Sequence, residues 1–318
     1  MTAVRARTAE RDTTLSVKGL EIEALDTEGR AVPIVRGVSF EVRQGEILGL
    51  LGESGAGKTM ICRAITGAMP PGIRIARGEI TIGGGGRAAA VFADAHASLD
   101  PLQKVGPQIA EVAQVSCGAN TRDARREALR LLELLKLREP SRVLGQYPFQ
   151  LSGGMAQRVM IAAALASQPR FIIADEPTSA LDATVQLDVL DVLRQLAVDE
   201  HVGILLTMHD IAAASRVCSR IAVAYAGKIC ETGSVQEITR RPRHPYTRLL
   251  MASRPTGRRG EHLTTIAGEP LSPGDPRPPC PFAPRCPRAT NICVEIEPPF
   301  VGAPSGFACH HPFDVPND

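Results

Sequence analysis

The segment at residues 52–59 constrains the fold more than any other part of the chain. Its sequence, GESGAGKT, follows an apolar run that ends at Leu51, and it fits the pattern G-x-x-x-x-G-K-[ST]. Glycines there let backbone N–H groups turn toward a phosphate, the lysine reaches the outer phosphates, and the final hydroxyl can hold magnesium. Such a loop joins a strand to a helix, so the pattern predicts an α/β fold. The candidate nucleotide-binding residues are Gly52, Glu53, Ser54, Gly55, Ala56, Gly57, Lys58 and Thr59.

Two acidic residues end a second apolar run. Residues 171–174 precede Asp175 and Glu176, which places both carboxylates at the carboxyl end of a predicted buried strand. Ligands bind at this edge of open α/β sheets. We therefore predict that Asp175 and Thr59 hold magnesium and that Glu176 polarises the attacking water. In isolation, either motif could be a plain turn, so the rest of the chain must decide.

The sequence LSGGMAQR at residues 151–158 offers a second anion site. A hydroxyl and two glycines precede a predicted helix, whose N-terminus favours negative charge. The candidate residues are Ser152, Gly153, Gly154 and Gln157. An enzyme with a single phosphate-binding site would not need this second anion site. Two such sites in the same chain imply that two chains pair.

The remaining pattern predicts an order of domains. Short strand-like runs over residues 15–50 predict a β-rich lobe, and leucines at helical spacing over 121–137 predict a helix capped by Thr121 or Asp123. That helix would belong to a helical subdomain at about 103–165. We expect further buried strands near 171–176, 203–210 and 221–233. We expect a flexible N-terminus at 1–14, one ATPase-type domain at 15–250, and an extension at 251–318 that is rich in proline and lacks a regular core.

Charge and hydropathy exclude several classes of protein. The net charge of +2 provides no strong field to attract nucleic acid or anionic lipid, so no nucleic-acid partner is expected. No apolar run reaches the roughly 20 residues that span a bilayer, and the first fourteen residues lack the apolar core of a signal peptide. A cytosolic location is expected, and membrane contact would then come through protein partners.

The ordered set GESGAGKT, LSGGMAQ, IIADEPTSALD and LLTMHD resembles the nucleotide-binding subunits of ABC transporters over about residues 15–250. The resemblance implies a P-loop NTPase of the ABC ATPase type that hydrolyses ATP with Mg²⁺. It also implies a head-to-tail dimer, in which residues 52–59 of one subunit and Ser152 to Gly154 of the other enclose one ATP. It further implies that Asp182 lies at the dimer seam and that His209 contacts the terminal phosphate as a catalytic residue.

Two positions depart from the family pattern. The family has a glutamine in its coupling loop, where this chain has Ala93, and alanine can neither ligate magnesium nor sense water. The early strand that normally supplies an aromatic residue to stack on adenine has Ala24 instead. We therefore expect the site built on Lys58 to be the slower one of an unequal pair, or to be coupled to transport differently.

The sequence RHPYTRLLMAS at residues 243–253, followed by a group of cysteines, resembles the extension of dipeptide, oligopeptide and nickel importer ATPases. This implies uptake of di- or oligopeptides at the cytoplasmic face of the cell membrane. The implied partners are a second, non-identical ATPase subunit, two membrane-spanning permease subunits and an extracytoplasmic substrate-binding protein. Alternative functions are a nickel or metal-chelate importer, a soluble ABC ATPase and a redox-sensing iron–sulfur ATPase.

Cys280, Cys286, Cys293 and Cys309 lie within the last forty residues, without the short C-x-x-C knuckles of structural zinc. We rank a [4Fe–4S] cluster first, Zn²⁺ second and disulfides third, with four unliganded thiols last. A metal bound there would supply folding energy to a segment with no evident core. The other cysteines, Cys62, Cys117, Cys218 and Cys230, are predicted to be reduced packing residues.

Overall fold

The computed structural model describes residues 13–26, 28–83, 87–253, 265–272, 274–275 and 277–314. Most of the N-terminal segment expected to be flexible, residues 1–12, lies outside these ranges. The chain forms two compact units. The first contains Val42–Ile47 and Ile82–Leu206 together with the start of the chain, and the second contains Ser16–Glu41, Leu48–Thr81 and Thr207–Asp318.

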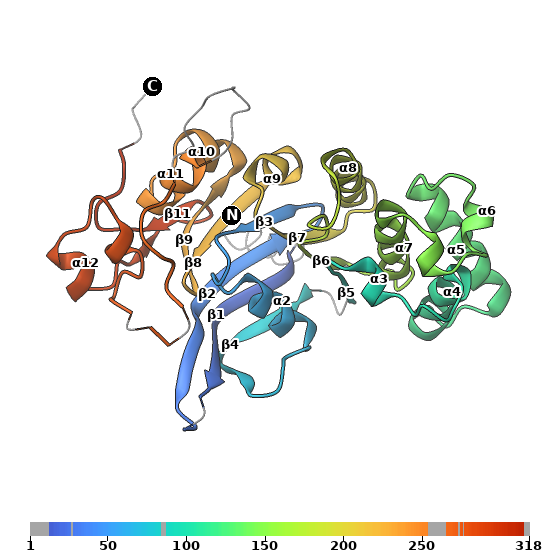
Figure 1. The fold of residues 1–318 in the computed structure, drawn as a ribbon, viewed down its shortest axis with the longest axis horizontal. Helices are drawn as coiled ribbons and strands as arrows, with labels where there is room; N and C mark the ends of the chain where they lie inside the picture. The colour runs from blue at the N-terminus through green and yellow to red at the C-terminus, as the bar shows by residue number, and fades with distance from the viewer. Residues whose placement is uncertain are drawn as a thin grey trace, which may run out of the picture. The chain divides into compact units, whose positions relative to one another are not determined.

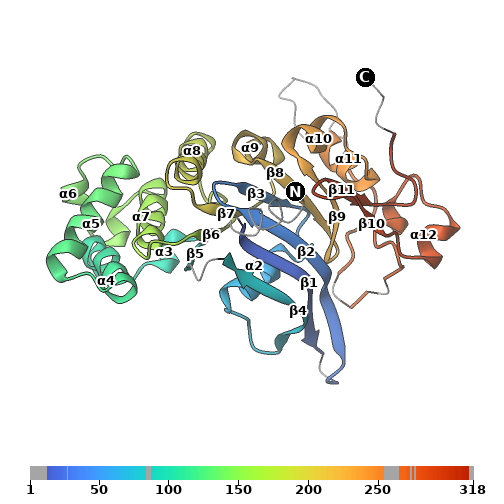
Figure 2. The same ribbon diagram turned by 180° about the vertical axis from the view of Figure 1, so that it is seen from behind.

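The first unit combines three strands with a group of helices (Figures 1 and 2). Its strands follow the order β7-β6-β5, and β5 and β6 are parallel, with Ala89 opposite Ile172. The first four residues of β6 are fully buried, as expected for a parallel strand covered on both faces. The elements are β5 (Ala88–Val91), α3 (Ala95–Ser98), α4 (Val105–Cys117), α5 (Thr121–Leu134), α6 (Pro140–Val143), η2 (Pro148–Gln150), α7 (Gly153–Leu165), β6 (Phe171–Asp175), α8 (Ala183–Asp199) and β7 (Gly203–Met208).

The amphipathic helix predicted from residue 121 is present as α5, but its N-cap is a different residue from those predicted. Its buried positions are Ala124, Ala128, Leu131 and Leu132, which recur at helical spacing. The cap is Asn120, whose side-chain oxygen accepts from the Asp123 N–H at 2.9 Å, so neither of the two predicted residues caps it. An N-cap residue needs extended backbone geometry, which Asn120 has, whereas residue 121 is already helical.

The second unit contains two sets of strands (Figure 1). One is a three-stranded sheet of order β2-β1-β4, and the other follows the order β10-β11-β9-β8-β3, in which β3 and β8 are parallel. All five residues of β3 are buried, which anchors the loop that follows it. The elements are β1 (Thr13–Leu25), β2 (Ala31–Arg43), β3 (Ile47–Leu51), α2 (Lys58–Thr66), β4 (Ile73–Ile82), α9 (Ile211–Val217), β8 (Arg220–Tyr225), β9 (Lys228–Ser234), α10 (Val235–Arg240), α11 (Pro245–Ala252), η3 (Ala283–Arg285), α12 (Asn291–Glu295), β10 (Phe300–Val301) and β11 (Gly306–Ala308).

The C-terminal extension has more regular structure than the sequence predicted. Strand β11 pairs antiparallel with β9, with Phe307 opposite Glu231, and β10 pairs with β11. Phe282 is 1% exposed and Tyr246 is fully buried, so the segment shares an apolar core with β8 and β9. Strands β10 and β11 have two and three residues and are too short to show an alternating pattern, so the sequence did not predict them. Among the described helices, none is long and apolar enough to cross a membrane.

Candidate functional site

The nucleotide loop connects β3 to α2 in the second unit. Gly57 caps α2 with φ of 97°, a left-handed conformation that glycine adopts without strain. Gly52 has φ of 156°, and a Cβ there would lie 2.2 Å from the Ala224 carbonyl oxygen. Glycine is therefore required at both positions. The loop leads directly into the N-terminus of the nine-residue helix α2, where the helix dipole favours an anion.

Lys58 is held inside this loop. Its side chain is 6% exposed, and Nζ donates to the carbonyl oxygens of Gly52 at 2.8 Å and Glu53 at 3.2 Å. Thr59, Ser54 and Gly55 are exposed. The lysine thus spans the loop with its charge near the backbone that a phosphate would approach, and the threonine hydroxyl lies open to a cation.

His209 directly follows β7 in the second unit and is exposed. The next residue, Asp210, caps α9 by accepting from the N–H groups of Ala212 at 2.8 Å and Ala213 at 3.1 Å. The strand end and the capped helix therefore fix the backbone on both sides of the histidine. That placement agrees with a side chain presented at the carboxyl edge of a sheet.

The two acidic residues lie in the first unit at the end of β6. Asp175 is the last residue of the strand, and both Asp175 and Glu176 are half-buried. Glu176 has φ of 48°, a left-handed conformation that costs a non-glycine residue roughly 1–2 kcal/mol. Strain of this kind persists where the surroundings impose it, and it is concentrated at functional sites.

The second glycine-rich motif begins α7, also in the first unit. Ser152 caps the helix by accepting from the Met155 N–H at 3.4 Å. A Cβ on Gly154 would lie 2.3 Å from Cγ1 of Val185, so close packing against α8 explains this glycine. Ser152 and Gly153 are exposed and Gly154 is half-buried, which leaves the helix N-terminus accessible to an anion from outside the chain.

Gln157 and Asp182 have contacts that the sequence did not predict. Gln157 is 1% exposed, and its Nε2 donates to the Phe92 carbonyl oxygen at 3.1 Å. It therefore faces the loop that contains Ala93 and not the open end of α7. Asp182 caps α8 by accepting from the N–H groups of Thr184 at 3.1 Å and Val185 at 3.0 Å, and it is exposed.

The loop around Ala93 retains its backbone structure without the usual functional side chain. Asp94 caps α3 by accepting from the Ala97 N–H at 3.0 Å, and Ser98 donates to the Asp94 carbonyl oxygen at 2.7 Å. Ala93 itself is half-buried and contributes only a methyl group. The backbone around Ala93 is therefore regular, and the departure from the pattern expected there lies in the side chain at this position.

Comparison with known proteins gives a consistent result. The sequence profile of the ABC transporter family matches residues 35–179, and that of the oligopeptide/dipeptide transporter C-terminal region matches residues 230–293. The dipeptide transport ATP-binding protein DppD of Bacillus subtilis is 37% identical over 301 residues, covering 89% of this chain and 90% of that protein. The chain belongs to the ATP-binding subunits of ABC transporters. The reaction of this family is the hydrolysis of ATP, with Mg²⁺ as the metal, coupled to transport.

Other relatives of this ABC subunit agree. The oligopeptide transport ATP-binding protein OppD of Bacillus subtilis is 41% identical over 304 residues, covering 90% of this chain and 84% of that protein. A solved ATP-binding subunit of an ABC transporter has a TM-score of 0.58 at 27% identity, covering 72% of this chain and 92% of that one. A bacterial ABC transporter cassette solved as a dimer has a TM-score of 0.57 at 25% identity, covering 70% of this chain and 98% of that one.

The four cysteines in the extension of this ABC subunit are neighbours. The backbone N–H of Cys280 donates to the Cys293 carbonyl oxygen at 3.0 Å. The pKa of the Cys309 thiol is raised to about 11, mainly by burial and to a smaller extent by the nearby thiols of Cys280, Cys286 and Cys293. Within the described ranges, however, no group of three or more His, Cys, Asp or Glu side chains is arranged to hold a metal ion. The predicted metal centre is therefore not supported by the arrangement of these side chains.

Three of the remaining cysteines agree with the packing role that the sequence predicted. Cys62, Cys218 and Cys230 are buried, and burial raises the pKa of Cys218 to about 12, which keeps it a thiol. Cys117 is exposed, so the prediction was wrong for this residue. It is the last residue of α4, and helix ends are commonly open to solvent.

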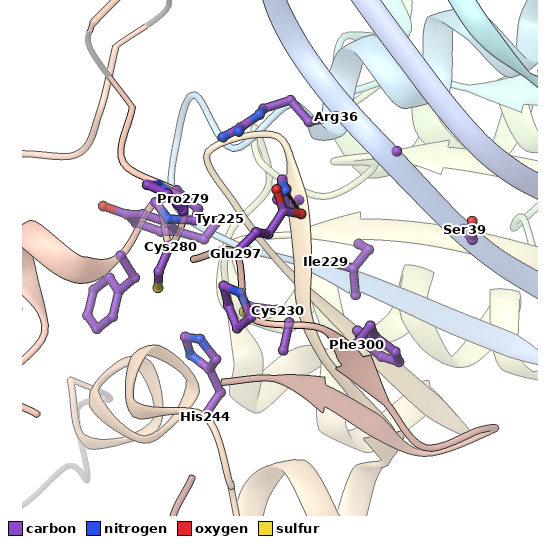
Figure 3. A pocket seen from close by; sticks show the side chains of 16 residues that line it. Arg36, Ser39, Tyr225, Ile229, Cys230, His244, Pro279, Cys280, Glu297 and Phe300 are labelled. Atoms are coloured by element: carbon purple, nitrogen blue, oxygen red, sulfur yellow. Dashed lines mark hydrogen bonds and ion pairs between the residues drawn. The ribbon is translucent and has the colours of Figure 1, made fainter. Parts of the chain in front are cut away.

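Sequence reasoning missed two residues that contact the nucleotide loop. Arg285 forms an ion pair with Glu53, and Tyr246 accepts a hydrogen bond from the Glu53 N–H. These residues lie 232 and 193 positions away from Glu53 in the sequence. Tyr246 is part of the RHPYT sequence, which had only indicated a subfamily, and no sequence pattern marked Arg285. Figure 3 shows the neighbouring pocket, which Tyr225, Cys230, His244 and Cys280 help to line.

Proposed function

We propose that this chain is the ATP-hydrolysing subunit of an importer for di- or oligopeptides. The observation that carries the proposal is the extension, whose residues 230–293 match the C-terminal region of oligopeptide/dipeptide transporters. Relatives at 37% and 41% identity are a dipeptide and an oligopeptide transport ATP-binding protein, each matched along nine-tenths of this chain. A nickel or metal-chelate importer is the alternative, because an ATPase subunit does not itself bind the cargo.

The proposed reaction assigns a role to each candidate residue. Lys58 and the loop amides bind the outer phosphates, Thr59 and Asp175 hold Mg²⁺, and Glu176 polarises the attacking water. His209 contacts the terminal phosphate. Ser152, Gly153 and Gly154 close over the ATP of the partner subunit, and Asp182 lies beside the seam between the two. The exposed N-terminus of α7 and the strained backbone of Glu176 support these roles.

We infer a heterodimer with a second ATPase subunit, because a homodimer would carry Ala93 at both ATP sites, whereas a different subunit can supply the family's glutamine at one of them. The proposed assembly also includes two membrane-spanning permease subunits and an extracytoplasmic substrate-binding protein. In this assembly the chain is peripheral, on the cytoplasmic face of the membrane. The proposed boundary near residue 250 separates the ATPase domain from the extension.

The test uses the complex assembled from this chain and the proposed second ATPase, permease and binding-protein subunits. Glu176→Gln should lower ATP hydrolysis roughly 100-fold or more while ATP binding is retained, because water activation is lost. Glu133→Gln, an exposed change on α5, should hydrolyse ATP like the wild type. Stimulation of hydrolysis by peptide-loaded binding protein supports peptide import. Stimulation by a nickel chelate alone would favour the alternative, and full activity of Glu176→Gln would refute the mechanism.

We also propose that Cys280, Cys286, Cys293 and Cys309 hold a [4Fe–4S] cluster as a structural staple, with Zn²⁺ as the alternative. Backbone N–H groups support this, because Arg288 N–H donates to Cys286 Sγ at 3.4 Å and His311 N–H to Cys309 Sγ at 3.3 Å. Such bonds stabilise a thiolate ligand. Iron, acid-labile sulfide and zinc measured on anaerobically purified protein distinguish the two metals. If the purified protein contains neither metal, and its stability does not change when iron and sulfide or zinc are added, both the [4Fe–4S] and the Zn²⁺ proposals are refuted.

A further inference from the structure

Glu53, the second residue of the nucleotide loop, is held by residues from the C-terminal part of the second unit. Its backbone N–H donates to the Tyr246 hydroxyl oxygen at 3.0 Å. Its carboxylate accepts from both ends of the Arg285 guanidinium, at 2.6 Å from Nη1 to Oε2 and 3.2 Å from Nη2 to Oε1. Its carbonyl oxygen accepts from Lys58 Nζ at 3.2 Å. All three polar parts of Glu53 are therefore engaged, one of them by the lysine of the loop itself.

Further hydrogen bonds, to residues outside the nucleotide loop, hold the Arg285 side chain in place. Its side chain is only 4% exposed. Nε donates to the Ala267 carbonyl oxygen at 3.0 Å, Nη2 to the Ile266 carbonyl oxygen at 3.3 Å and Nη1 to the Tyr225 hydroxyl at 3.3 Å. A planar guanidinium held at all three nitrogens cannot rotate, so it presents a fixed two-pronged partner to the carboxylate.

Tyr246 is equally constrained. It is fully buried at the start of α11, and its ring packs on Tyr225 at 4.6 Å and Phe282 at 5.3 Å between centroids. The N-cap of this helix is His244, whose Nδ1 accepts from the Tyr246 N–H at 3.0 Å. Two of the three tyrosines in the chain thus form one cluster that places a hydroxyl beside the loop.

The contacts of Arg285 and Tyr246 with Glu53 affect phosphate binding in two ways, through the charge of the Glu53 carboxylate and through the backbone conformation of the loop. A free carboxylate at the second loop position would repel a phosphate, and the Arg285 pair compensates that charge at partly buried positions where screening is weak. The Tyr246 contact fixes the peptide unit before Glu53, so the backbone conformation of the loop is set from outside. A loop that is preorganised in this way loses less entropy when it binds ATP.

We propose that Arg285, in the C-terminal extension, and Tyr246, just before it, are positioning residues for the nucleotide loop, so that contacts from the C-terminal part of the second unit set the affinity for ATP. This inference rests on ATP binding by the loop. A purely structural role predicts a change in stability alone, whereas a positioning role predicts a change in ATP affinity at temperatures where the protein remains folded.

The test measures the dissociation constant for ATP and the unfolding temperature without nucleotide, on the full chain. Arg285→Gln should weaken ATP binding about tenfold or more, because it removes a charge-assisted, two-pronged contact. The matched control is Arg248→Gln, which removes the same charge from an exposed arginine over the Phe313 ring and should bind ATP within about twofold of the wild type.

Tyr246→Phe keeps the packed ring and removes only the hydroxyl that accepts from Glu53. It should weaken ATP binding about threefold or more with little change in unfolding temperature. It also keeps the proposal testable if Arg285→Gln does not fold. Wild-type affinity in Tyr246→Phe, or in a folded Arg285→Gln, would overturn the proposal.

Lys58→Ala separates this inference from the function on which it depends. The wild type should bind ATP, and Lys58→Ala should not. If the wild-type chain binds no ATP, the ATPase function itself fails. If the wild type binds ATP and Arg285→Gln binds it equally well, only the positioning role fails.

Discussion

Among single residues, His244 shows how burial sets a chemical property. It is 3% exposed, and burial lowers the pKa of its imidazole from 6.5 to about 4. The neighbouring Glu231 accepts from the backbone N–H groups of Arg243 and His244 at 2.7 and 3.0 Å, and burial raises the pKa of this carboxyl. The folded chain therefore favours neutral histidine, which also caps α11 through Nδ1.

Stability should consequently depend on pH through His244. The histidine favours the folded state above its unfolded pKa of about 6.5, and this contribution is lost as pH falls toward about 4, because the unfolded chain takes up the proton first. Between these values the free energy of unfolding should fall by up to about 1.4 kcal/mol per pH unit. Urea unfolding of the wild type and His244→Asn from pH 7 to pH 5 measures this.

Asparagine is a suitable replacement because its side-chain oxygen can still cap α11 but does not titrate. The His244→Asn variant should therefore show a flatter dependence of stability on pH than the wild type. Identical slopes for the two proteins would mean that His244 titrates as it does in the unfolded chain.

At the scale of single elements, the helix boundaries show which local signals decide. The apolar spacing correctly predicted α5, and the Ser-Gly-Gly start correctly predicted α7, whereas the cap of α5 is Asn120 and not Thr121 or Asp123. Asn120 uses both ends of its amide, since Oδ1 accepts from Asp123 N–H at 2.9 Å and Nδ2 donates to Asp123 Oδ2 at 2.8 Å. Thr121 lies inside the helix and cannot replace it.

Asn120→Ala should therefore destabilise the first turn of α5 by about 1 kcal/mol. Hydrogen exchange of the Asp123 and Ala124 amides would report this as roughly fivefold faster opening. Thr121→Ala, one residue further on, should leave both rates close to those of the wild type. Equal effects of the two substitutions would contradict the observed cap.

At the scale of the whole molecule, the candidate residues divide between the two units. The nucleotide loop and His209 belong to the second unit, while Glu176 and the N-terminus of α7 belong to the first. In the proposed head-to-tail dimer, the nucleotide loop would bind the subunit's own ATP. The glycine-rich helix start would close over the ATP of its partner.

If Ala93 makes this chain's own site the weaker one, two substitutions should differ in their effect on the assembled complex. Lys58→Ala removes the phosphate contact of the chain's own site, and Ser152→Arg blocks the helix start that serves the partner's ATP. Ser152→Arg should cause the larger loss of ATP hydrolysis in a steady-state assay. Ser152→Ala controls for loss of the cap alone, and equal losses for Lys58→Ala and Ser152→Arg would contradict the asymmetry.

By itself, the sequence determined the parts whose causes are local. The nucleotide loop, the acidic strand end and the glycine-rich start of α7 depend on spacing, glycine geometry and apolar runs within a few residues. The parallel strands β3 and β6 follow from continuous burial in the same way.

Only the tertiary structure decided contacts between distant segments. Gln157 faces the Phe92 carbonyl, β11 joins β9, and Arg285 reaches Glu53 across 232 residues. In an isolated helix or turn, the side chains of Gln157 and Arg285 could point in several directions, and a strand as short as β11 could pair with any open edge. The fold selects one direction, because a buried polar group must find a hydrogen-bond partner wherever the packed chain provides one.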